Sequence, residues 1–296
     1  MCRKFRPLNG ISVLISAQNE QSTIRMCVES FLEFGDELII VTNGSTDKTP
    51  EICRELETLY PDKVKYYKND SLIDLSENRQ YAYSKSKYKW IFRCDGDYIA
   101  YNIEDGRYSI TKLRNQLLQM RTLRPVAIWV EQVNINIKWD LTRKPIDSND
   151  ESLTKLIGPP LYVGFMPRIY TRNIFFKFVK KGKNEGVNLN RLYKQVFISD
   201  PFWFHCTIKS DKDLFLRTER RAWRATNDYI KFPTIEDFFK KKVLKEKYGD
   251  SSIEDAISDY RENVINPLLT KYDPLSCYPY PKRIQEIIGK ECSSNE

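Results

Sequence analysis

The 296-residue sequence lacks any long apolar run. The longest run near its start, residues 11–17, is interrupted by serines at positions 12 and 16. No stretch approaches the roughly 18 apolar residues that a membrane-spanning helix requires. No segment has the pattern of a signal peptide or an anchor. We therefore expect a folded protein of the cytoplasm rather than an integral membrane protein.

Paired cysteines and glycine-rich loops are also missing. The seven cysteines include no C-x-x-C pair, which argues against a zinc ribbon or a disulfide framework and suits a reducing compartment. The first predicted strand is followed by residues 16–20 (SAQNE), which contain no glycine. A Rossmann dehydrogenase needs G-x-G-x-x-G at this point, and a sugar-phosphate nucleotidyltransferase needs a glycine-rich phosphate loop. The sequence argues against both classes.

What the chain does have is a basic balance and enough apolar residues for a core. Forty-eight Lys and Arg against 40 Asp and Glu give a net charge of +8, which favours anionic partners such as nucleotides, phospholipid head groups or acidic glycans. Aromatic residues make up 13% of the chain, but they are not interleaved with basic ones and no zinc-finger or RRM signature accompanies them. We expect no nucleic-acid partner.

The first hundred residues alternate short apolar runs with amphipathic segments. The pattern predicts strands at 11–15, 38–41, 64–67 and 90–94, with helices capped by Asn19, beginning near Thr49 and Pro50, and spanning 74–86. Strands that alternate with helices predict an α/β fold with a parallel sheet, covered on both faces, whose ligands lie outside the carboxyl ends of the strands.

The remainder is less regular. We expect a helix at 109–121, one long strand at 126–139, a loop at 140–160, strand-like residues at 161–180, and helices near 211–225, 235–247 and 253–265.

Polar residues cluster where the predicted strands end. Residues 16–20 and 43–47 follow the first two strands, and Asp95 and Asp97 follow the fourth. Two carboxylates two residues apart can turn toward one ion while Gly96 clears space, and Mg²⁺ or Mn²⁺ bound there can also bind phosphate oxygens. By itself, the triplet is also a common acidic turn of protein surfaces.

Three stretches together make the pattern specific. Residues 11–20 (ISVLISAQNE), 38–49 (LIIVTNGSTDKT) and 90–97 (WIFRCDGD) resemble the family 2 nucleotide-sugar glycosyltransferases of GT-A fold. The resemblance implies a Rossmann-like, mostly parallel sheet flanked by helices, followed by a C-terminal helical extension. It divides the chain into a catalytic domain at 1–207, with the nucleotide sugar bound by 1–110 and the acceptor by 111–207, and an extension at 208–296.

The resemblance also assigns residues to the nucleotide sugar. Arg79 would pair with phosphate oxygens, although it can equally be an ordinary surface arginine. Family members commonly have an aspartate where this chain has Thr42 or Asn43, so the identity of the base stays open, and residues 43–45 are also a plain tight turn. The implied nucleotide-binding residues are Ser16, Ala17, Gln18, Asn19, Glu20, Asn43, Arg79 and Asp95.

The expected cofactor is Mn²⁺ or Mg²⁺, with Asp97 as a direct ligand. His205 is the only histidine. A lone histidine among aromatic residues is often structural, but GT-A enzymes often add a late histidine to the metal site, and neutral imidazole is a suitable ligand. Arg217, Arg221 and Arg224 follow on one helical stripe, which could hold a diphosphate or an anionic acceptor, or simply face solvent.

An inverting enzyme needs a base that takes the proton from the acceptor hydroxyl. Glu185 is our candidate, because it lies in a glycine-flanked turn, residues 182–186, where related enzymes present their acidic base. Glu131, Asp140 and Asp200 compete with it.

The expected activity is therefore inverting transfer of a sugar from a nucleotide-sugar donor, with UDP as the expected nucleotide, to a glycan or lipid-linked acceptor in cell-surface polysaccharide synthesis. The alternative is a catalytically degenerate domain that binds nucleotide or glycan as an assembly partner. Five lysines within 240–247 lie beside Ile235, Phe238 and Phe239, a basic amphipathic pattern that suits peripheral contact with the inner face of a membrane. Packing against the catalytic domain explains the apolar stripe equally well.

Overall fold

A computed structural model describes residues 7–70, 75–143, 166–181, 184–189, 191–249 and 251–293. The described residues form a seven-stranded sheet in the order β12-β6-β9-β4-β1-β2-β3. Among these strands β9 runs antiparallel to both of its neighbours, and the other pairs are parallel. The predicted α/β class with a mostly parallel sheet is confirmed. The strands are β1 (Leu8–Ala17), β2 (Glu37–Thr42), β3 (Val64–Lys68), β4 (Tyr88–Asp95), β6 (Val126–Val130), β9 (Met166–Thr171) and β12 (Lys194–Ile198).

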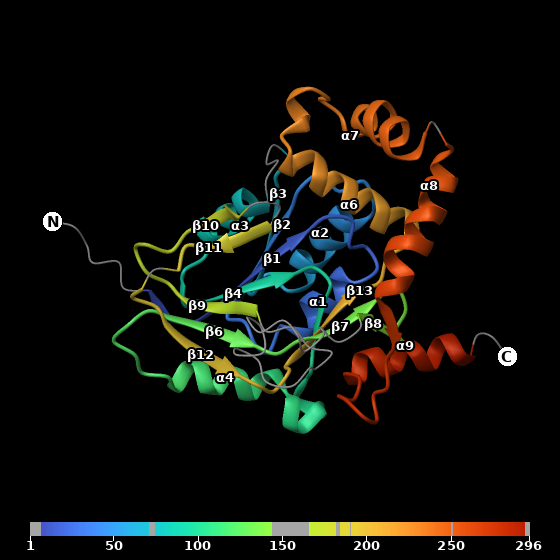
Figure 1. Ribbon diagram of the computed structural model, residues 1–296. Helices are drawn as coiled ribbons and strands as arrows, with labels where there is room; N and C mark the ends of the chain where they lie inside the picture. Colours follow the sequence, from blue (N-terminus) through green and yellow to red (C-terminus); the bar gives the residue numbers. More distant parts are fainter. Residues whose placement is uncertain are drawn as a thin grey trace.

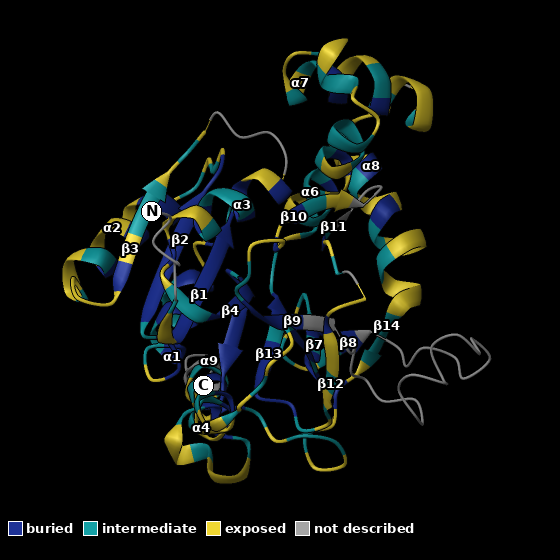
Figure 2. Cartoon of the chain, turned by 90° about the vertical axis from the view of Figure 1, so that its left-hand side faces the viewer, coloured by how far each residue is buried: buried dark blue, intermediate teal, exposed yellow. Residues whose placement is uncertain are grey.

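Helices cover both faces of this sheet (Figure 1). In β1, Val13 and Ile15 pack into one cluster and Leu14 into the other, which is why apolar residues stand at three consecutive positions there rather than alternating with polar ones. Figure 2 shows β1 and β4 buried at the centre, with exposed residues on the outer sides of the helices. One face carries α1 (Ile24–Ser30), α2 (Thr49–Leu59) and α4 (Ile110–Gln119), and the other carries α3 (Leu75–Lys85).

A second, five-stranded sheet has the order β14-β8-β7-β13-β5. It corrects one prediction, because the single strand expected at 126–139 is divided between the two sheets. After β6 the chain turns at Glu131 and Gln132, and β7 then pairs with β13, while Ile137 ends it with a φ of 73°. The strands are β5 (Tyr98–Ala100), β7 (Val133–Asn136), β8 (Leu141–Arg143), β13 (Trp203–Thr207) and β14 (Leu269–Lys271).

A hairpin, β10 (Phe178–Lys181) and β11 (Asn184–Val187), packs beside α3, where Phe178 and Val187 join the cluster that contains Ala82. Of the loop expected at 140–160, residues 141–143 form β8, and residues 144–160 lie outside the described residues. The strand-like pattern at 161–180 corresponds, where it is described, to β9 and β10.

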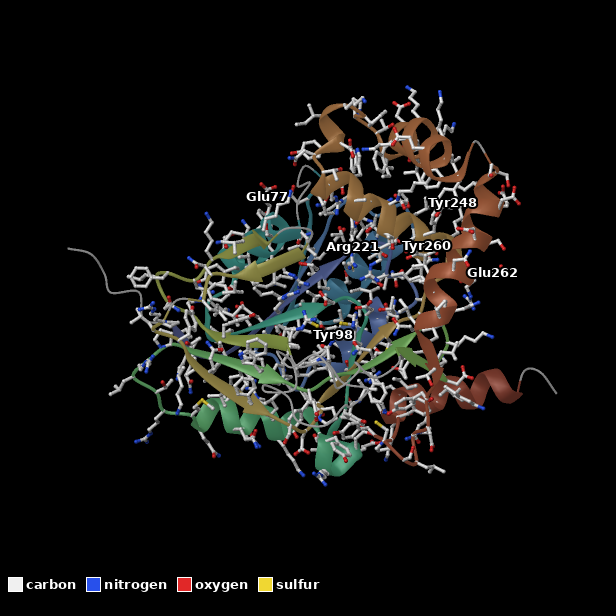
Figure 3. All side chains as sticks on the ribbon, in the orientation of Figure 1. Glu77, Tyr98, Arg221, Tyr248, Tyr260 and Glu262 are labelled. Atoms are coloured by element: carbon white, nitrogen blue, oxygen red, sulfur yellow. The ribbon has the colours of Figure 1, made fainter. Side chains whose placement is uncertain are left out.

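The C-terminal extension packs around Phe215, which is fully buried among Phe238, Phe239, Val243 and Tyr260. Figure 3 places Tyr248 and Tyr260 between the helices of this cluster. The three predicted helices are present, and the apolar stripe of residues 235–247 is buried inside the extension. The elements are α6 (Asp211–Ala225), η2 (Asp228–Ile230), α7 (Ile235–Phe238), the π-helical η3 (Phe239–Lys247) and η4 (Arg261–Ile265), α8 (Ile253–Tyr260), η5 (Asn266–Leu268) and α9 (Lys282–Ser293).

The end of the extension returns to the small sheet. Tyr272 and Ile284 pack with Ile99 and Phe204, and η1 (Ile103–Tyr108) lies at the same end, where Lys282 N donates to Asp105 Oδ1 at 3.0 Å. No helix among the described residues is both long and apolar enough to cross a bilayer.

Candidate metal and nucleotide site

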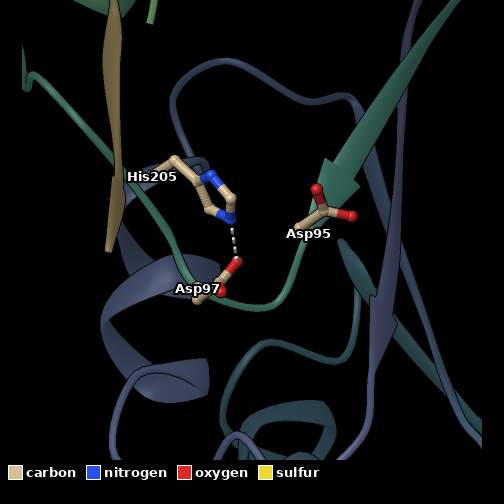
Figure 4. A group of neighbouring side chains, drawn as sticks. All are labelled: Asp95, Asp97 and His205. Atoms are coloured by element: carbon tan, nitrogen blue, oxygen red, sulfur yellow. Dashed lines mark ion pairs between the residues drawn. The ribbon is translucent and has the colours of Figure 1, made fainter. Parts of the chain in front are cut away.

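Two strands bring the acidic triplet and the histidine together. Asp95 ends β4, and the turn after it carries Asp97 into β5. Because His205 on β13 pairs in register with Tyr98 on β5, the imidazole stands beside the triplet. Ligand atoms of Asp95, Asp97 and His205 all lie within 4.8 Å of one another. In Figure 4 the ring of His205 points at Asp97, with Nε2 at 3.4 Å from Oδ1, and Asp95 lies beside this pair.

Gly96 lets this turn pack against the end of β1. A Cβ at position 96 would lie 3.0 Å from Cβ of Ala17 and 3.1 Å from Cγ of Glu20. A larger residue at this position would therefore push the turn away from the β1 edge.

Asp97 has the environment of a metal ligand. Its side chain is 2% exposed, and neither carboxylate oxygen accepts a hydrogen bond from the described residues. Burial opposes ionisation, but His205 and the Arg217 guanidinium, whose Nη1 is 3.9 Å from Oδ2, outweigh it and lower the pKa of Asp97. Buried carboxylates normally have hydrogen-bond partners, so a cation fits here. Two carboxylates and an imidazole are donors that Mn²⁺ and Mg²⁺ accept.

Asp95 differs from Asp97 because protein groups engage both of its oxygens. Arg79 on α3 pairs with Oδ1, and Nη1 of Arg168 on β9 lies 3.3 Å from Oδ2. Burial alone would raise the pKa of Asp95, but the two guanidinium groups hold it well below its usual range. Asp95 is therefore an ionised and firmly oriented carboxylate.

Arg79 does not lie at the surface, as an ordinary surface arginine would. It is fully buried and also donates to the main-chain carbonyls of Leu14 and Cys94, so it ties β1 and β4 together beneath Asp95. Among its contacts are therefore these two carbonyls and the Asp95 carboxylate.

Glu20 follows β1 and lies near Asp97. Burial, reinforced by the charge of Asp97, raises its pKa to about 7, although Lys209 opposes the shift. Lys209 Nζ is 2.7 Å from Glu20 Oε2 and also donates to the carbonyl of Asn19. The lysine thus links the first loop to the segment just before α6.

The two polar clusters of the sequence form one double loop. Gln18 Nε2 donates to the carbonyl of Asn43 at 2.6 Å, and Glu20 N donates to Thr49 Oγ1 at 2.8 Å. Asn19 has a φ of 55°, and its Oδ1 accepts from Thr46 N at 2.8 Å. The prediction that Asn19 caps the first helix is therefore wrong, because Thr23 precedes α1 and Asn19 joins the loops instead.

The inner wall of this double loop is tightly packed. Ser16 Oγ donates to Asn78 Oδ1 at 3.2 Å, while Ala17 and Asn43 are 3% and 6% exposed. Sequence reasoning missed Asp70, which follows β3 and accepts from Gly44 N at 2.9 Å. The position of Asp70 after the third predicted strand could have indicated that it lies at the same edge of the sheet. Asp70 gives this loop a carboxylate that Thr42 and Asn43 do not supply.

The backbone of Glu185 lies in β11, opposite Lys180, and its side chain is outside the described residues. The hairpin bridges two helices of the site, since Phe178 N donates to Gln80 Oε1 on α3 and Lys180 Nζ donates to the carbonyl of Arg224 on α6. The rival carboxylates have other surroundings. Glu131 accepts from the Tyr278 hydroxyl at 3.0 Å, Asp200 pairs with Arg107 at 3.0 Å, and Asp140 is exposed.

The arginines predicted to share one stripe of α6 have different surroundings. Arg217 turns toward Asp97, as described above, whereas Arg221 is exposed; in Figure 3 it lies beside α6 above the sheet. The i, i+4 spacing alone did not separate these two roles.

Two polar side chains behind His205 were not singled out from the sequence. His205 Nδ1 lies 3.0 Å from Asn134 Oδ1, which is also 3.1 Å from Gln132 Nε2. Gln132 Oε1 in turn accepts from the Trp203 indole at 3.3 Å. The sequence alone does not indicate that these two side chains contact His205, because only the pairing of β7 with β13 brings them to the histidine.

Comparison with known proteins gives a family match. The family model described as glycosyl transferase family 2 matches residues 12–180. The minor teichoic acid biosynthesis protein GgaA of Bacillus subtilis (strain 168) is 27% identical over an alignment of 114 residues, and the match covers 30% of this chain and 26% of that protein. The chain thus spans about a quarter of the length of this curated relative.

Solved structures are similar at low identity. S. aureus TarS 1-349 in complex with UDP is 12% identical, with a TM-score of 0.44 over 83% of this chain and 77% of that one. The mannosyltransferase PcManGT from Pyrobaculum calidifontis, in complex with GDP-Man and Mn²⁺, is 12% identical, with a TM-score of 0.46 over 89% of this chain and 84% of that one.

Proposed function

The chain belongs to glycosyl transferase family 2, with an α/β fold of the GT-A type, and we propose that it is a metal-dependent, inverting glycosyltransferase that uses a nucleotide-sugar donor. The observation that carries the proposal is Asp97, a buried carboxylate whose oxygens accept no hydrogen bond from the described residues and which faces Asp95 and His205. Family 2 membership supplies the reaction class, and this site supplies the place for the cation.

Asp97 and His205 would hold Mn²⁺ or Mg²⁺, together with Asp95. The ion supplies positive charge that offsets the charge on the departing nucleoside diphosphate. Arg217, next to Asp97, adds a second positive charge on the same side, and its partly exposed side chain can turn toward the diphosphate. The guanidinium groups of Arg79 and Arg168 keep Asp95 ionised and fixed in place.

The donor nucleoside is assigned to the double loop at the ends of β1 and β2. Ser16, Ala17, Gln18, Asn19 and Asn43 form its walls, and their mutual hydrogen bonds make it pre-organised, which lowers the entropic cost of binding. We keep UDP as the expected nucleotide. The Glu20 side chain pairs with Lys209 and is influenced by the charge of Asp97, so we place its contact on the diphosphate side.

Glu185 remains our candidate for the base. Its hairpin lies between the helix of Arg79 and the helix of Arg217, and Glu131 and Asp200 are engaged elsewhere. In the proposed reaction the Glu185 carboxylate accepts the proton of the acceptor hydroxyl as that oxygen attacks the anomeric carbon. The test is Glu185→Gln, which should abolish transfer to the acceptor while leaving donor affinity within about threefold. Wild-type transfer by this variant would remove Glu185 from the mechanism.

For the acceptor we propose a glycan or lipid-linked chain of a cell-surface polymer. The partial similarity to a teichoic acid biosynthesis protein supports this class, as does the net charge of +8, which suits an anionic polymer. We place the acceptor on the part of the catalytic domain after residue 110 and keep a boundary near residue 207, four residues before α6 begins at Asp211.

A panel of nucleotide sugars tests the proposal. The protein is incubated with each donor in Mn²⁺ or in EDTA, and release of nucleoside diphosphate is measured for the wild type and for Asp97→Asn. We expect one donor to be cleaved in Mn²⁺ by the wild type alone. A catalytically degenerate binding domain, the alternative that the missing aspartate at Thr42 and Asn43 favours, would bind a donor without releasing nucleoside diphosphate.

We also propose a cytoplasmic location with peripheral membrane contact. The contact would be an electrostatic attraction between exposed lysines and anionic lipids. The apolar stripe of η3 is buried in the extension, and Lys241, Lys242 and Lys247 form ion pairs. Lys240 and Lys245 are exposed cations of the same segment. Sedimentation with anionic liposomes should therefore be weak and lost at high salt; binding that survives high salt would show that the contact is apolar.

A further inference from the structure

We propose that Gln132 and Asn134 are positioning residues that fix the tautomer of His205, so that Nδ1 always carries a proton and Nε2 presents its lone pair to the cation. The proposal rests on the proposed function only in giving the imidazole a metal to bind. The relay itself consists of Trp203, Gln132, Asn134 and His205.

The direction of the relay follows from its first member. An indole N–H can only donate, so the Gln132 oxygen must face Trp203 and the Gln132 amide N–H must point away. That N–H meets Asn134 Oδ1 at 3.1 Å, which makes this atom an acceptor. The same oxygen lies 3.0 Å from His205 Nδ1, so Nδ1 must be the donor. Reversing either amide would set two donors against each other.

The relay is anchored in the core, where it cannot easily rearrange. Trp203 is fully buried and stacks on Tyr98 with a centroid distance of 5.9 Å, and Gln132 is 3% exposed. A buried amide that loses its hydrogen-bond partner lowers the stability of the fold. The donor-only indole therefore sets the orientation of both amides from the side remote from the metal.

One of the two groups facing Nε2, the Asp97 carboxylate, favours the opposite arrangement, which makes the inference testable. Asp97 Oδ1 and Thr207 Oγ1 each lie 3.4 Å from Nε2. The carboxylate alone would favour a proton on Nε2, and such a nitrogen cannot bind a cation. With the relay intact, a neutral His205 keeps its proton on Nδ1 and the Thr207 hydroxyl can donate to Nε2. Nε2 and Asp97 would then both be able to hold a cation.

Because the chain contains one histidine, selective ¹⁵N-histidine labelling reports this ring alone. Spectra are recorded on the folded, full-length protein at pH 9, well above the ordinary imidazole pKa of about 6.5. They are first taken in EDTA and then during titration with Zn²⁺, a diamagnetic ion that binds imidazole well. We expect Nδ1 to carry the proton throughout, and the Nε2 resonance to shift as Zn²⁺ binds. A neutral ring with its proton on Nε2 in the wild type would overturn the proposal.

Three variants separate the relay from simple packing. Asn134→Asp keeps an acceptor toward both partners and should keep the proton on Nδ1. Asn134→Leu removes the acceptor, so the proton should move to Nε2, and Mn²⁺ affinity, measured by electron paramagnetic resonance, should fall by about 10- to 100-fold. Asn136→Leu makes the same change two residues along β7, outside the relay, and should alter neither the tautomer nor the affinity.

An unchanged tautomer in folded Asn134→Leu, or an equal loss of affinity in Asn136→Leu, would contradict the proposal. If Asn134→Leu does not fold, the wild-type spectrum and Asn134→Asp still decide the matter, because a proton on Nε2 in either one contradicts the relay. None of these readouts depends on sugar transfer. Failure of the proposed function would appear as absent donor cleavage with an intact Nδ1–H signal.

Discussion

Asp95→Asn and Asp97→Asn are the same chemical change at two neighbouring carboxylates, and the structure predicts that only the first lowers the free energy of unfolding strongly. Asp95 pairs with both Arg79 and Arg168, whose side chains are 0% and 4% exposed. Removing one partner of such a buried ion pair leaves an uncompensated charge, which typically costs about 3–5 kcal/mol. We therefore expect Asp95→Asn to lower the free energy of unfolding by about that amount.

Asp97 accepts no hydrogen bond from the described residues, and its nearest cationic groups are His205 at 3.4 Å and the partly exposed Arg217 at 3.9 Å. In Asp97→Asn the loss of these attractions is offset by relief of the cost of burying the charge. We expect the free energy of unfolding to change by no more than about 1 kcal/mol, the range of weak ion pairs. Mn²⁺ affinity should nevertheless be lost.

Urea denaturation in EDTA measures the stability of both variants without any contribution from bound metal, and Mn²⁺ titration measures the site. The reasoning is refuted if Asp97→Asn is destabilised as strongly as Asp95→Asn, because Asp97 would then be a structural carboxylate. An Asp95→Asn variant with the stability of the wild type would equally refute it, since Arg79 and Arg168 would then not require the Asp95 charge for stability.

Further predictions concern pH, packing and metal. Burial, only partly opposed by the Tyr278 hydroxyl, raises the pKa of Glu131 from 4.5 to about 7. The folded protein therefore keeps this proton to higher pH than the unfolded chain, and the free energy of unfolding falls as pH rises between these values. Glu131→Gln should remove a penalty of up to about 3 kcal/mol at pH 8. Comparing the unfolding free energies of wild type and variant at pH 4 and pH 8 tests this, and a constant difference would contradict it. Tyr272→Ala should cost about 3–5 kcal/mol because the buried ring joins the extension to the small sheet, whereas Leu275→Ala, 96% exposed, should stay within about 0.5 kcal/mol; equal losses would mean that the extension does not contribute to this core. Mn²⁺ at a hundred times its Kd should stabilise the wild type by about 2.7 kcal/mol and leave Asp97→Asn unchanged in a thermal-shift assay, so a shift of equal size in both would place the ion elsewhere.

The first four strands and their helices could be predicted from the sequence because both faces of the sheet are buried. Residues 38–41 are apolar throughout, residues 11–15 are apolar except for Ser12, and the ends of both runs are marked by polar turns. The break at Glu131 and Gln132 could not be predicted, since a strand that leaves one sheet for another keeps its apolar residues, and only its tertiary pairing changes.

In the candidate site, too, some residues could be predicted from the sequence and others could not. Asp95 and Asp97 follow a strand and could be found from local pattern. The burial of Arg79 could not, because a buried guanidinium depends on carbonyls and a carboxylate from other strands, and sequence spacing does not show them. The approach of His205 and Arg217 depends on β13 pairing with β5, about a hundred residues away in the chain.

The central claim is that one cation is held between Asp95, Asp97 and His205. The most direct measurement is anomalous scattering from crystals grown with Mn²⁺ and a nucleoside diphosphate. We predict one anomalous peak in contact with Asp97 and with Nε2 of His205, and diphosphate oxygens on its open side. An ion bound away from Asp97, or a diphosphate bound at the double loop with no ion beside it, would contradict the account.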